Sequence, residues 1–190
     1  MKKIYLILFL FPILLLFSCR QDYTPKPRGY MKIEYPEKKY VRFDAGAPFS
    51  FSYPEYAKVI PDSSINAEPW WYNIIFPSFD GTIYLSYKEV NENVNIFIED
   101  SRNLVYKHTI MAESIDESLI YIPEKKIFGI IYDLKGNTAS SLQFFLTDSS
   151  QHFMRGSLYF NSTPEKDSLA PIVSFIRLDL EEFIHSFQWN

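Results

Sequence analysis

The stretch SLIYIPEKKIFGIIYDLKGNTASSLQFFLTDSSQHFMRGSLYF, residues 118–160, decides the fold of this chain. It holds runs rich in β-branched and aromatic residues at 118–122, 126–133, 140–147 and 153–160. Turn-forming residues separate the runs, namely Pro123-Glu124, Gly136-Asn137 and Asp148-Ser149-Ser150. Runs of this kind at short spacing predict strands of an antiparallel meander.

The segment after the meander predicts a long amphipathic helix. Thr163 is a suitable cap, and Pro164 suits the first helical position. Apolar residues then recur at spacings of three and four, namely Leu169, Ile172, Val173, Ile176, Leu180, Phe183, Ile184 and Phe187. A face this continuous must pack on a sheet. Pro171 lies inside the segment, so the helix either kinks there or begins at about residue 170.

Upstream of the meander, residues 93–108 change to a helical period. The apolar face that this period predicts consists of Val94, Phe97, Leu104, Val105 and His108. Further towards the N-terminus, residues 49–53 alternate strictly and predict a strand. Residues 70–76 and 82–87 predict the two strands of a hairpin, and residues 56–69 are expected to be a loop.

This order of elements favours an α+β fold, with an antiparallel sheet of about six to seven strands packed against two main helices. We expect a single globular domain over residues 41–190. The order is similar to the PsbP/Mog1-like sandwich architecture, an analogy that by itself carries no function.

Composition narrows the class of protein. A chain of 190 residues with 47% apolar and 22% charged residues is expected to fold rather than to be disordered. The net charge of -4 gives no electrostatic footprint for nucleic acid. A single cysteine excludes an intramolecular disulfide and a thiolate zinc site.

That cysteine follows a secretory signal pattern. Lys2 and Lys3 precede an apolar run at residues 4–17, which is too short to be a confident membrane span. The run ends in Leu16-Phe17-Ser18-Cys19, which resembles a bacterial lipobox. The resemblance implies that residues 1–18 are removed and that Cys19 carries the lipid. The alternative is a signal anchor in which the cysteine has no role.

Residues 19–40 form the predicted tether between the lipid and the domain. Prolines and charges are frequent here, and no helical or strand period persists. The simpler interpretation is a solvated spacer. The alternative is a docking strip in which Tyr23, Arg28 and Tyr30 contact a protein partner, since proline-stiffened segments bind at low entropic cost.

The sequence contains no recognisable catalytic motif. His108, His152 and His185 have no partner at a metal-ligand spacing, and neither a G-x-S-x-G turn nor a phosphate-binding loop is present. His108 on an apolar face is interpreted as structural. We therefore expect a protein that is not an enzyme and uses no metal or cofactor.

Three side chains in the domain remain candidates for interaction. Trp70 and Trp71 are adjacent on a predicted strand and should point to opposite faces, so one is expected in the core and the other at a surface. Arg155 lies near the last turn of the meander. It is expected to pair with Asp148 across that hairpin, and a ligand contact is the alternative.

The whole chain resembles the gliding-motility lipoprotein family GldD of Bacteroidetes. The resemblance rests on residues 22–30 (DYTPKPRGY), 144–148 (FFLTD) and 155–160 (RGSLYF), together with the C-terminal segment from Pro164 to Trp189. It implies a non-enzymatic envelope lipoprotein that is required for gliding and linked to type IX secretion, with protein partners in that apparatus. A periplasm-facing domain is expected, on either the inner or the outer membrane. The alternative function is a periplasmic ligand-binding lipoprotein for a cell-wall fragment or a lipid.

Overall fold

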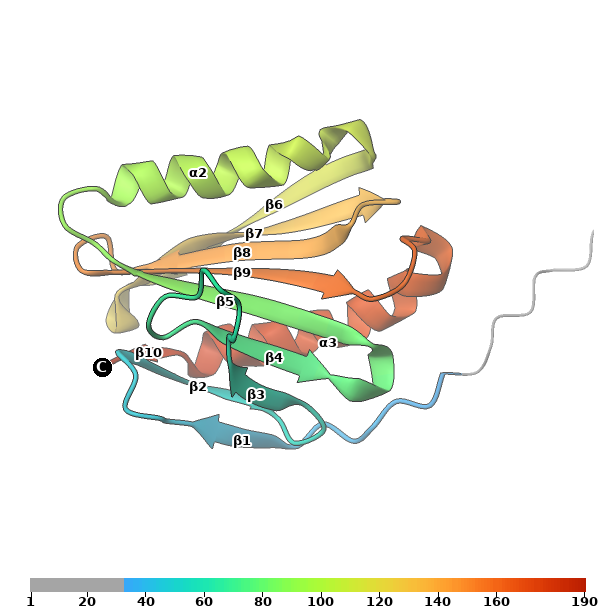
Figure 1. Cartoon of the computed structure of the whole chain (residues 1–190), viewed down its shortest axis with the longest axis horizontal. Helices are drawn as coiled ribbons and strands as arrows, with labels where there is room; N and C mark the ends of the chain where they lie inside the picture. The colour runs from blue at the N-terminus through green and yellow to red at the C-terminus, as the bar shows by residue number, and fades with distance from the viewer. Residues whose placement is uncertain (1–32) are drawn as a thin grey trace, which may run out of the picture. The chain divides into compact units, whose positions relative to one another are not determined.

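The computed structural model describes residues 33–190 (Figure 1). The predicted signal peptide, Cys19 and the tether residues Tyr23, Arg28 and Tyr30 lie outside the described residues. Residues Glu34–Asn190 form one compact unit.

The centre of the domain is an antiparallel sheet with the strand order β3-β4-β5-β9-β8-β7-β6. Its strands are β3 Lys58–Pro61, β4 Tyr72–Phe76, β5 Gly81–Glu89, β6 Ala112–Ile122, β7 Ile127–Gly136, β8 Ser140–Thr147 and β9 His152–Phe160. Short 3-10 turns η1 Pro77–Phe79, η2 Lys107–Ile110 and η3 Pro123–Lys125 connect or extend the elements. The predicted meander and hairpin are confirmed, and the pairing of β5 with β9 joins them into one sheet.

Helix α2, Val94–Tyr106, covers one face of this sheet and packs on β8 and β9 (Figure 1). Val105 is buried there against Phe145 and Phe153, and the rings of Phe97 and Phe153 lie 5.5 Å apart. The predicted inner position of Leu104 is wrong, because its side chain is 38% exposed. Leu104 lies roughly 100° around the helix from Val105, which places it at the flank of the buried face.

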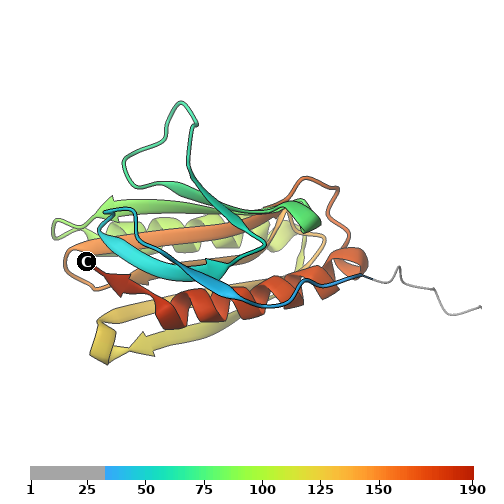
Figure 2. The same ribbon diagram turned by 90° about the horizontal axis from the view of Figure 1, so that it is seen from below.

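Helix α3, Lys166–Ser186, lies across the opposite face (Figure 2). A small sheet packs against it, with the order β1-β2-β10 and the strands β1 Tyr40–Phe43, β2 Phe49–Pro54 and β10 Gln188–Trp189. The Phe183 ring joins these layers, because its centroid lies 4.5 Å from that of Phe51 and 5.6 Å from that of Phe144. Gly156 allows this packing, since a Cβ there would lie 2.2 Å from the Phe144 ring.

Some predicted boundaries are wrong. Helix α3 begins at Lys166 with Glu165 as its cap, so Thr163 and Pro164 precede the helix and Pro171 lies within it. The residues around the first two turns are only half-buried or exposed, and packing tightens from Ile176 onwards. Strands β1, β3 and β10 were not predicted, and β3 occupies part of the expected loop.

Residues ahead of the predicted boundary at 41 already pack on α3. The Tyr35 ring stacks on Phe175 at 4.5 Å, and Lys38 Nζ lies 3.7 Å from the centre of the same ring. Lys38 also forms an ion pair of 2.6 Å with Asp179, whose side chain is only 2% exposed. The segment that leaves the tether is therefore fixed to the last helix by a buried charge.

Two tyrosines complete the surroundings of Asp179. Tyr40 donates a hydrogen bond of 2.9 Å to Oδ1, and Tyr56 donates one to Oδ2. Burial, followed by the hydrogen bond to Asp179, raises the pKa of Tyr40 and of Tyr56 above the ordinary value. Both hydroxyls therefore keep their protons, and this buried carboxylate connects the segment 38–40 and the β2–β3 turn to α3.

Candidate functional site

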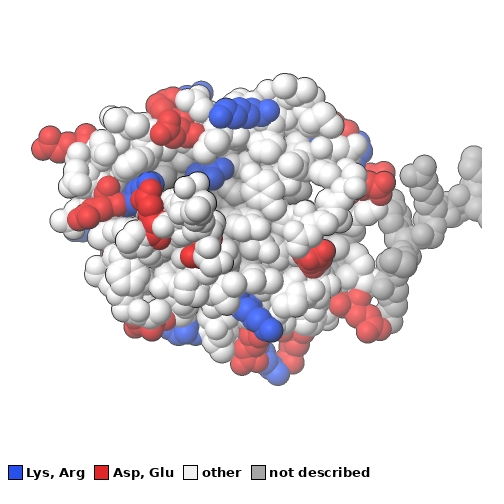
Figure 3. All heavy atoms as spheres, viewed as in Figure 1, with Lys and Arg blue, Asp and Glu red and all other residues white. Residues whose placement is uncertain are grey.

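The face of the large sheet that carries α2 is only half covered. The helix packs over β8 and β9, and β4 and β5 lie beside it (Figure 1). The space-filling view shows this open area as a hollow between α2 and the β3–β4 loop (Figure 3). The loop stands away from the sheet and forms the other wall (Figure 2).

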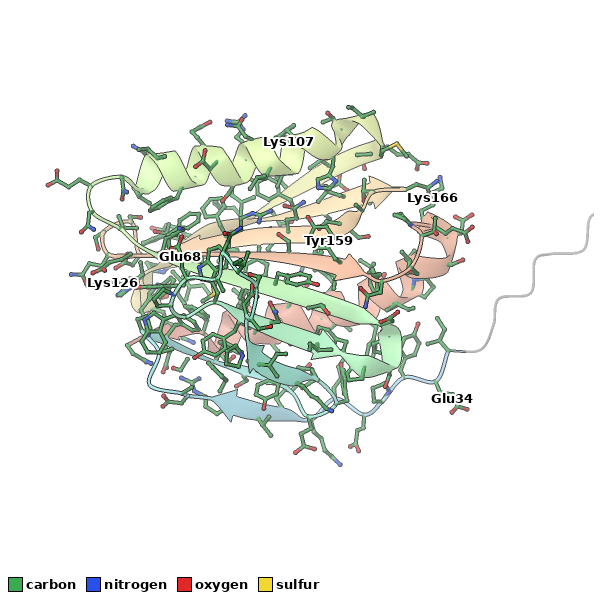
Figure 4. The ribbon with its side chains drawn as sticks, viewed as in Figure 1. Glu34, Glu68, Lys107, Lys126, Tyr159 and Lys166 are labelled. Atoms are coloured by element: carbon green, nitrogen blue, oxygen red, sulfur yellow. The ribbon has the colours of Figure 1, made fainter. Side chains whose placement is uncertain are left out.

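Strand register places a row of polar side chains across the open face. Asn73 on β4 is opposite Tyr84 on β5, Tyr84 is opposite Ser157 on β9, and Ser157 is opposite Gln143 on β8. With strands about 4.8 Å apart, the row extends over about 14 Å. Tyr159, labelled in Figure 4, lies on the same face of β9 two residues beyond Ser157.

Arg155 belongs to this same face and is half-buried. Its Nη2 donates a hydrogen bond of 2.6 Å to Oε1 of Gln143. Burial lowers the pKa of the guanidinium, and interaction with Tyr159 opposes that shift. Among residues 33–190, no carboxylate forms an ion pair with Arg155.

The predicted pair between Arg155 and Asp148 is therefore wrong. Asp148 lies in the β8–β9 turn, where its Oδ1 accepts backbone N–H groups of Ser150, Gln151 and His152 at 2.8–3.0 Å. Burial raises the pKa of Asp148, but these donors outweigh it and bring the pKa below the ordinary value. The turn itself satisfies this carboxylate, which leaves Arg155 with neutral partners.

Three polar atoms of the row have no hydrogen-bond partner within the described part of the chain. They are Oδ1 of Asn73, Nε2 of Gln143 and Oγ of Ser157. Gln143 and Ser157 are each only 1% exposed. Most buried polar atoms in native proteins are hydrogen-bonded, so unpaired atoms gathered on one face require an explanation.

The two tryptophans lie at the other end of the open face. Trp70 and Trp71 both precede β4, which begins at Tyr72, so the prediction that the two tryptophans are on a strand is wrong. Trp70 has a positive φ of 67°. Trp70 is 40% exposed. Trp71 is half-buried, and its Nε1 donates a hydrogen bond of 3.0 Å to the carbonyl of Tyr87. Lys88 Nζ lies 5.6 Å from the centre of the Trp71 ring.

Trp70 borders an open groove of about 690 Å³ beside the C-terminus. Tyr87 and His152 also line it, with 2.8 Å between the tyrosine oxygen and Nδ1 of the histidine. The His152 ring stacks on Trp189 at 5.1 Å. The groove is wide and partly polar. The contacts of His152 with Tyr87 and Trp189 fix the position of this side chain in its wall.

The histidines do not form a joint site. His108 is half-buried, and burial followed by the charge of Arg155 lowers its pKa. His185 is exposed on α3. Within residues 33–190, no group of acidic, histidine or cysteine side chains is placed to hold a metal ion. Over the same residues, no helix is both long and apolar enough to cross a membrane.

Sequence reasoning found Arg155 but missed Asn73, Gln143 and Ser157. The available signal was a polar residue inside an otherwise apolar strand, as in Tyr72-Asn73-Ile74. That signal became informative only once the strand order placed these side chains side by side.

The fold defines a PsbP-like α+β domain. The structure is similar to the solution structure of cyanobacterial PsbP (CyanoP) from Synechocystis sp. PCC 6803, with a TM-score of 0.50 and 10% sequence identity. The match covers 86% of this chain and 98% of that one. It establishes the likeness of fold alone.

The family follows from the sequence. The family model described as gliding motility lipoprotein GldD matches residues 20–189, so the chain belongs to that family. A search of curated proteins finds no match. The chain is therefore a gliding motility lipoprotein, which implies a membrane-anchored place in the cell envelope.

Proposed function

We propose that this chain is a lipid-anchored, non-catalytic component of the gliding apparatus, linked to type IX protein secretion, whose domain faces the periplasm. The observation that carries the proposal is the family match over residues 20–189. The lipobox at Leu16-Phe17-Ser18-Cys19 supplies the anchor that such a role requires. In this role the lipid on Cys19 joins the chain to the membrane.

The domain carries a surface suited to a protein partner. Strand β6 is the last strand of the described sheet, and it pairs with β7 along one side only. Leu119 and Tyr121 on this strand are 78% and 68% exposed. An edge strand with exposed apolar side chains is a common contact surface between proteins. An accessory or scaffold role uses a surface of this kind.

Deletion of the gene tests the proposed function. Surface spreading and secretion of type IX cargo are both scored, with the wild-type chain as the complement. Failure of both processes, restored by the wild type, is the expected result. If spreading fails while secretion stays intact, the protein acts in the motor or with the adhesins, downstream of export. The proposed link to type IX secretion would then be wrong. No change in either process would refute the proposal.

A surface variant tests the scaffold role separately. Leu119→Glu adds a charge at the β6 edge, and the matched control Leu178→Glu adds one at a 50% exposed position of α3. After mild cross-linking in cells, the Leu119 variant should recover fewer secretion components than the control. Equal recovery from both variants would show that the β6 edge is not the contact.

The groove at Trp70 favours a second candidate function, a periplasmic ligand-binding lipoprotein. A volume of about 690 Å³ is large enough for a cell-wall fragment or a lipid headgroup. Unchanged spreading and unchanged secretion after deletion of the gene would support this ligand-binding function. Loss of both spreading and secretion would favour the role in the gliding apparatus over ligand binding.

A further inference from the structure

The 3-10 turn η2 between α2 and β6 presents two adjacent apolar side chains to solvent. Ile110 is 90% exposed and Met111 is 58% exposed, and the exposed Lys107 begins the same turn. We name Lys107, Ile110 and Met111 the Ile110 tip. The turn is closed by the backbone N–H of Met111, which donates a hydrogen bond of 3.0 Å to the carbonyl of His108. The apolar pair therefore projects from a hydrogen-bonded turn.

The Ile110 tip lies on the side of the domain where the chain leaves for the tether. Met111 is beside the end of β7, since a Cβ on Gly136 would be 2.8 Å from the Met111 carbonyl oxygen. The β7–β8 turn that follows contacts the start of α3, where the backbone N–H of Lys166 donates a hydrogen bond of 3.0 Å into it. Figure 4 labels Lys166 and Glu34 on the right-hand side of the domain, and Figure 1 shows the start of β6 on that side as well.

The chain between Cys19 and Glu34 limits how far this side can lie from the membrane. In the proposed role Cys19 carries the lipid, and the residues up to Glu34 span at most about 50 Å when fully extended. A contact between the domain and the same bilayer is then an intramolecular event, for which a short linker gives an effective concentration on the order of millimolar. A weak contact that could not hold a free chain on a membrane is therefore sufficient here.

The side chains of the tip suit the surface of a bilayer. An apolar side chain gains free energy when it leaves water, and a neighbouring lysine buries its methylene stem while its ammonium stays among the headgroups. The first two acidic side chains of β6 do not oppose this contact, because Glu113 pairs with Lys166 and Asp116 pairs with Lys135. The contact should therefore depend on apolar burial and should form on lipids without net charge.

We propose that the Ile110 tip inserts into the surface of the bilayer that holds the Cys19 lipid. The domain then rests on the membrane through the side that carries its tether. The Trp70 groove beside the C-terminus lies on the other side of the domain and is turned away from the bilayer (Figure 1). The inference rests on the lipid anchor of the proposed function and adds to it the face that meets the membrane.

Fluorescence quenching by lipid tests the insertion. The mature chain, residues 19–190, is coupled through Cys19, its one thiol, to a maleimide lipid in phosphatidylcholine vesicles with brominated acyl chains. In Ile110→Trp the added fluorescence should fall by about half or more relative to unbrominated vesicles, because bromine quenches an indole that enters the acyl boundary. The matched control is Ile65→Trp, in the β3–β4 loop, where the isoleucine is 99% exposed. Its added fluorescence should change by less than about a tenth.

The native tryptophans give the orientation in the same experiment. Trp70 borders the groove beside the C-terminus, and Trp189 stacks on His152 in the wall of that groove. The wild-type chain should therefore lose little fluorescence on brominated vesicles. Quenching of the wild type as strong as that of Ile110→Trp, or equal quenching at positions 110 and 65, would overturn the orientation. An absence of quenching at position 110 would overturn the insertion and leave the tip to a protein partner.

A charge at the tip measures the strength of the contact. A single myristoyl chain coupled to Cys19 gives only marginal, reversible membrane binding, so a second contact raises the affinity measurably. Ile110→Asp should lower the affinity for phosphatidylcholine vesicles by about tenfold in co-sedimentation, and Ile65→Asp should leave it unchanged. Both side chains are exposed, so neither variant should change thermal stability. Equal affinities of the two variants would refute the insertion.

The lipid composition and the coupling separate this inference from its alternatives. A difference between the variants that appears only on anionic phosphatidylglycerol vesicles would show a charge contact of Lys107 and would refute apolar insertion. The lipid is attached to Cys19 chemically, so neither experiment depends on processing at the lipobox or on gliding. A failure of the tip to insert would therefore leave the proposed function intact, and a failure of the deletion test would leave the membrane contact intact.

Discussion

Asp179 is the buried charge that holds the N-terminal segment of the domain on α3, and its replacement is a direct test of that packing. The carboxylate accepts hydrogen bonds from Lys38, Tyr40 and Tyr56. Breaking a buried ion pair by removing one partner costs about 3–5 kcal/mol. A single hydrogen bond to a charged group contributes about 1.5–3 kcal/mol, and the contributions of groups that share one partner are not additive.

Asp179→Asn should cost less than the full loss of the ion pair. The amide keeps one carbonyl oxygen, which still accepts from one of the tyrosines. Lys38 is 24% exposed and retains the carbonyl of Phe175 at 3.0 Å, so its charge is not stranded. We therefore expect a loss of about 2–3 kcal/mol for Asn, and of about 3–5 kcal/mol for Asp179→Ala.

Urea denaturation of the soluble mature chain measures this loss. With a slope of about 1–3 kcal/mol per molar urea, the Asn variant should unfold at a midpoint lower by about 0.7–3 M. Glu181→Gln is the matched control, because Glu181 lies on the same helix, is 55% exposed and pairs with Arg177. It should change stability by less than about 0.5 kcal/mol. Equal midpoints for the two variants would refute the role given to Asp179.

Three further predictions concern the same domain. The raised pKa values of Tyr40 and Tyr56 mean that their stabilisation is complete below about pH 10 and decreases above it, because the unfolded chain then releases protons that the folded chain keeps. A urea midpoint that stays constant between about pH 9 and about pH 11 would contradict this. Gly156→Ala should cost about 1–3 kcal/mol or more by thermal denaturation, because the added Cβ would lie 2.2 Å from an aromatic ring on the neighbouring strand. Trp71→Ala should cost about 2 kcal/mol and Trp70→Ala less than about 0.5 kcal/mol, and the reverse order would show that their packing is misassigned.

The long elements were predictable because their signals are local. Runs of β-branched and aromatic residues with turn-forming residues between them identify β7 to β9 and the second half of β6, and a three-four period identifies both helices. The first half of β6, residues 112–117, was missed, because its acidic residues Glu113, Asp116 and Glu117 were expected near the end of the first helix. Strands β1, β3 and β10 carry no such signal. They are two to four residues long, and β10 is held by residues such as Phe49, which pairs with Trp189 from the opposite end of the chain.

The candidate sites depended on contacts that the sequence could not provide. Ser157 and Asn73 come together only because β9 pairs with β5, a strand far away in sequence. Asp179 did carry a signal, as an acidic residue beside Leu180 on an apolar helix face. Its partners Lys38 and Tyr56 lie in segments that were predicted to be tether and loop. Arg155 was found, but its expected partner is satisfied by the turn in which it lies.

The central claim is that the domain works as a membrane-anchored part of the gliding apparatus. The most direct test compares surface spreading of deletion cells that carry the wild-type chain with cells that carry residues 20–190 behind an ordinary cleavable secretory signal. The second chain exports the same domain without Cys19 and its lipid. We predict that only the wild type restores spreading at matched amounts of protein in the envelope. Full spreading with the unanchored domain would contradict the claim.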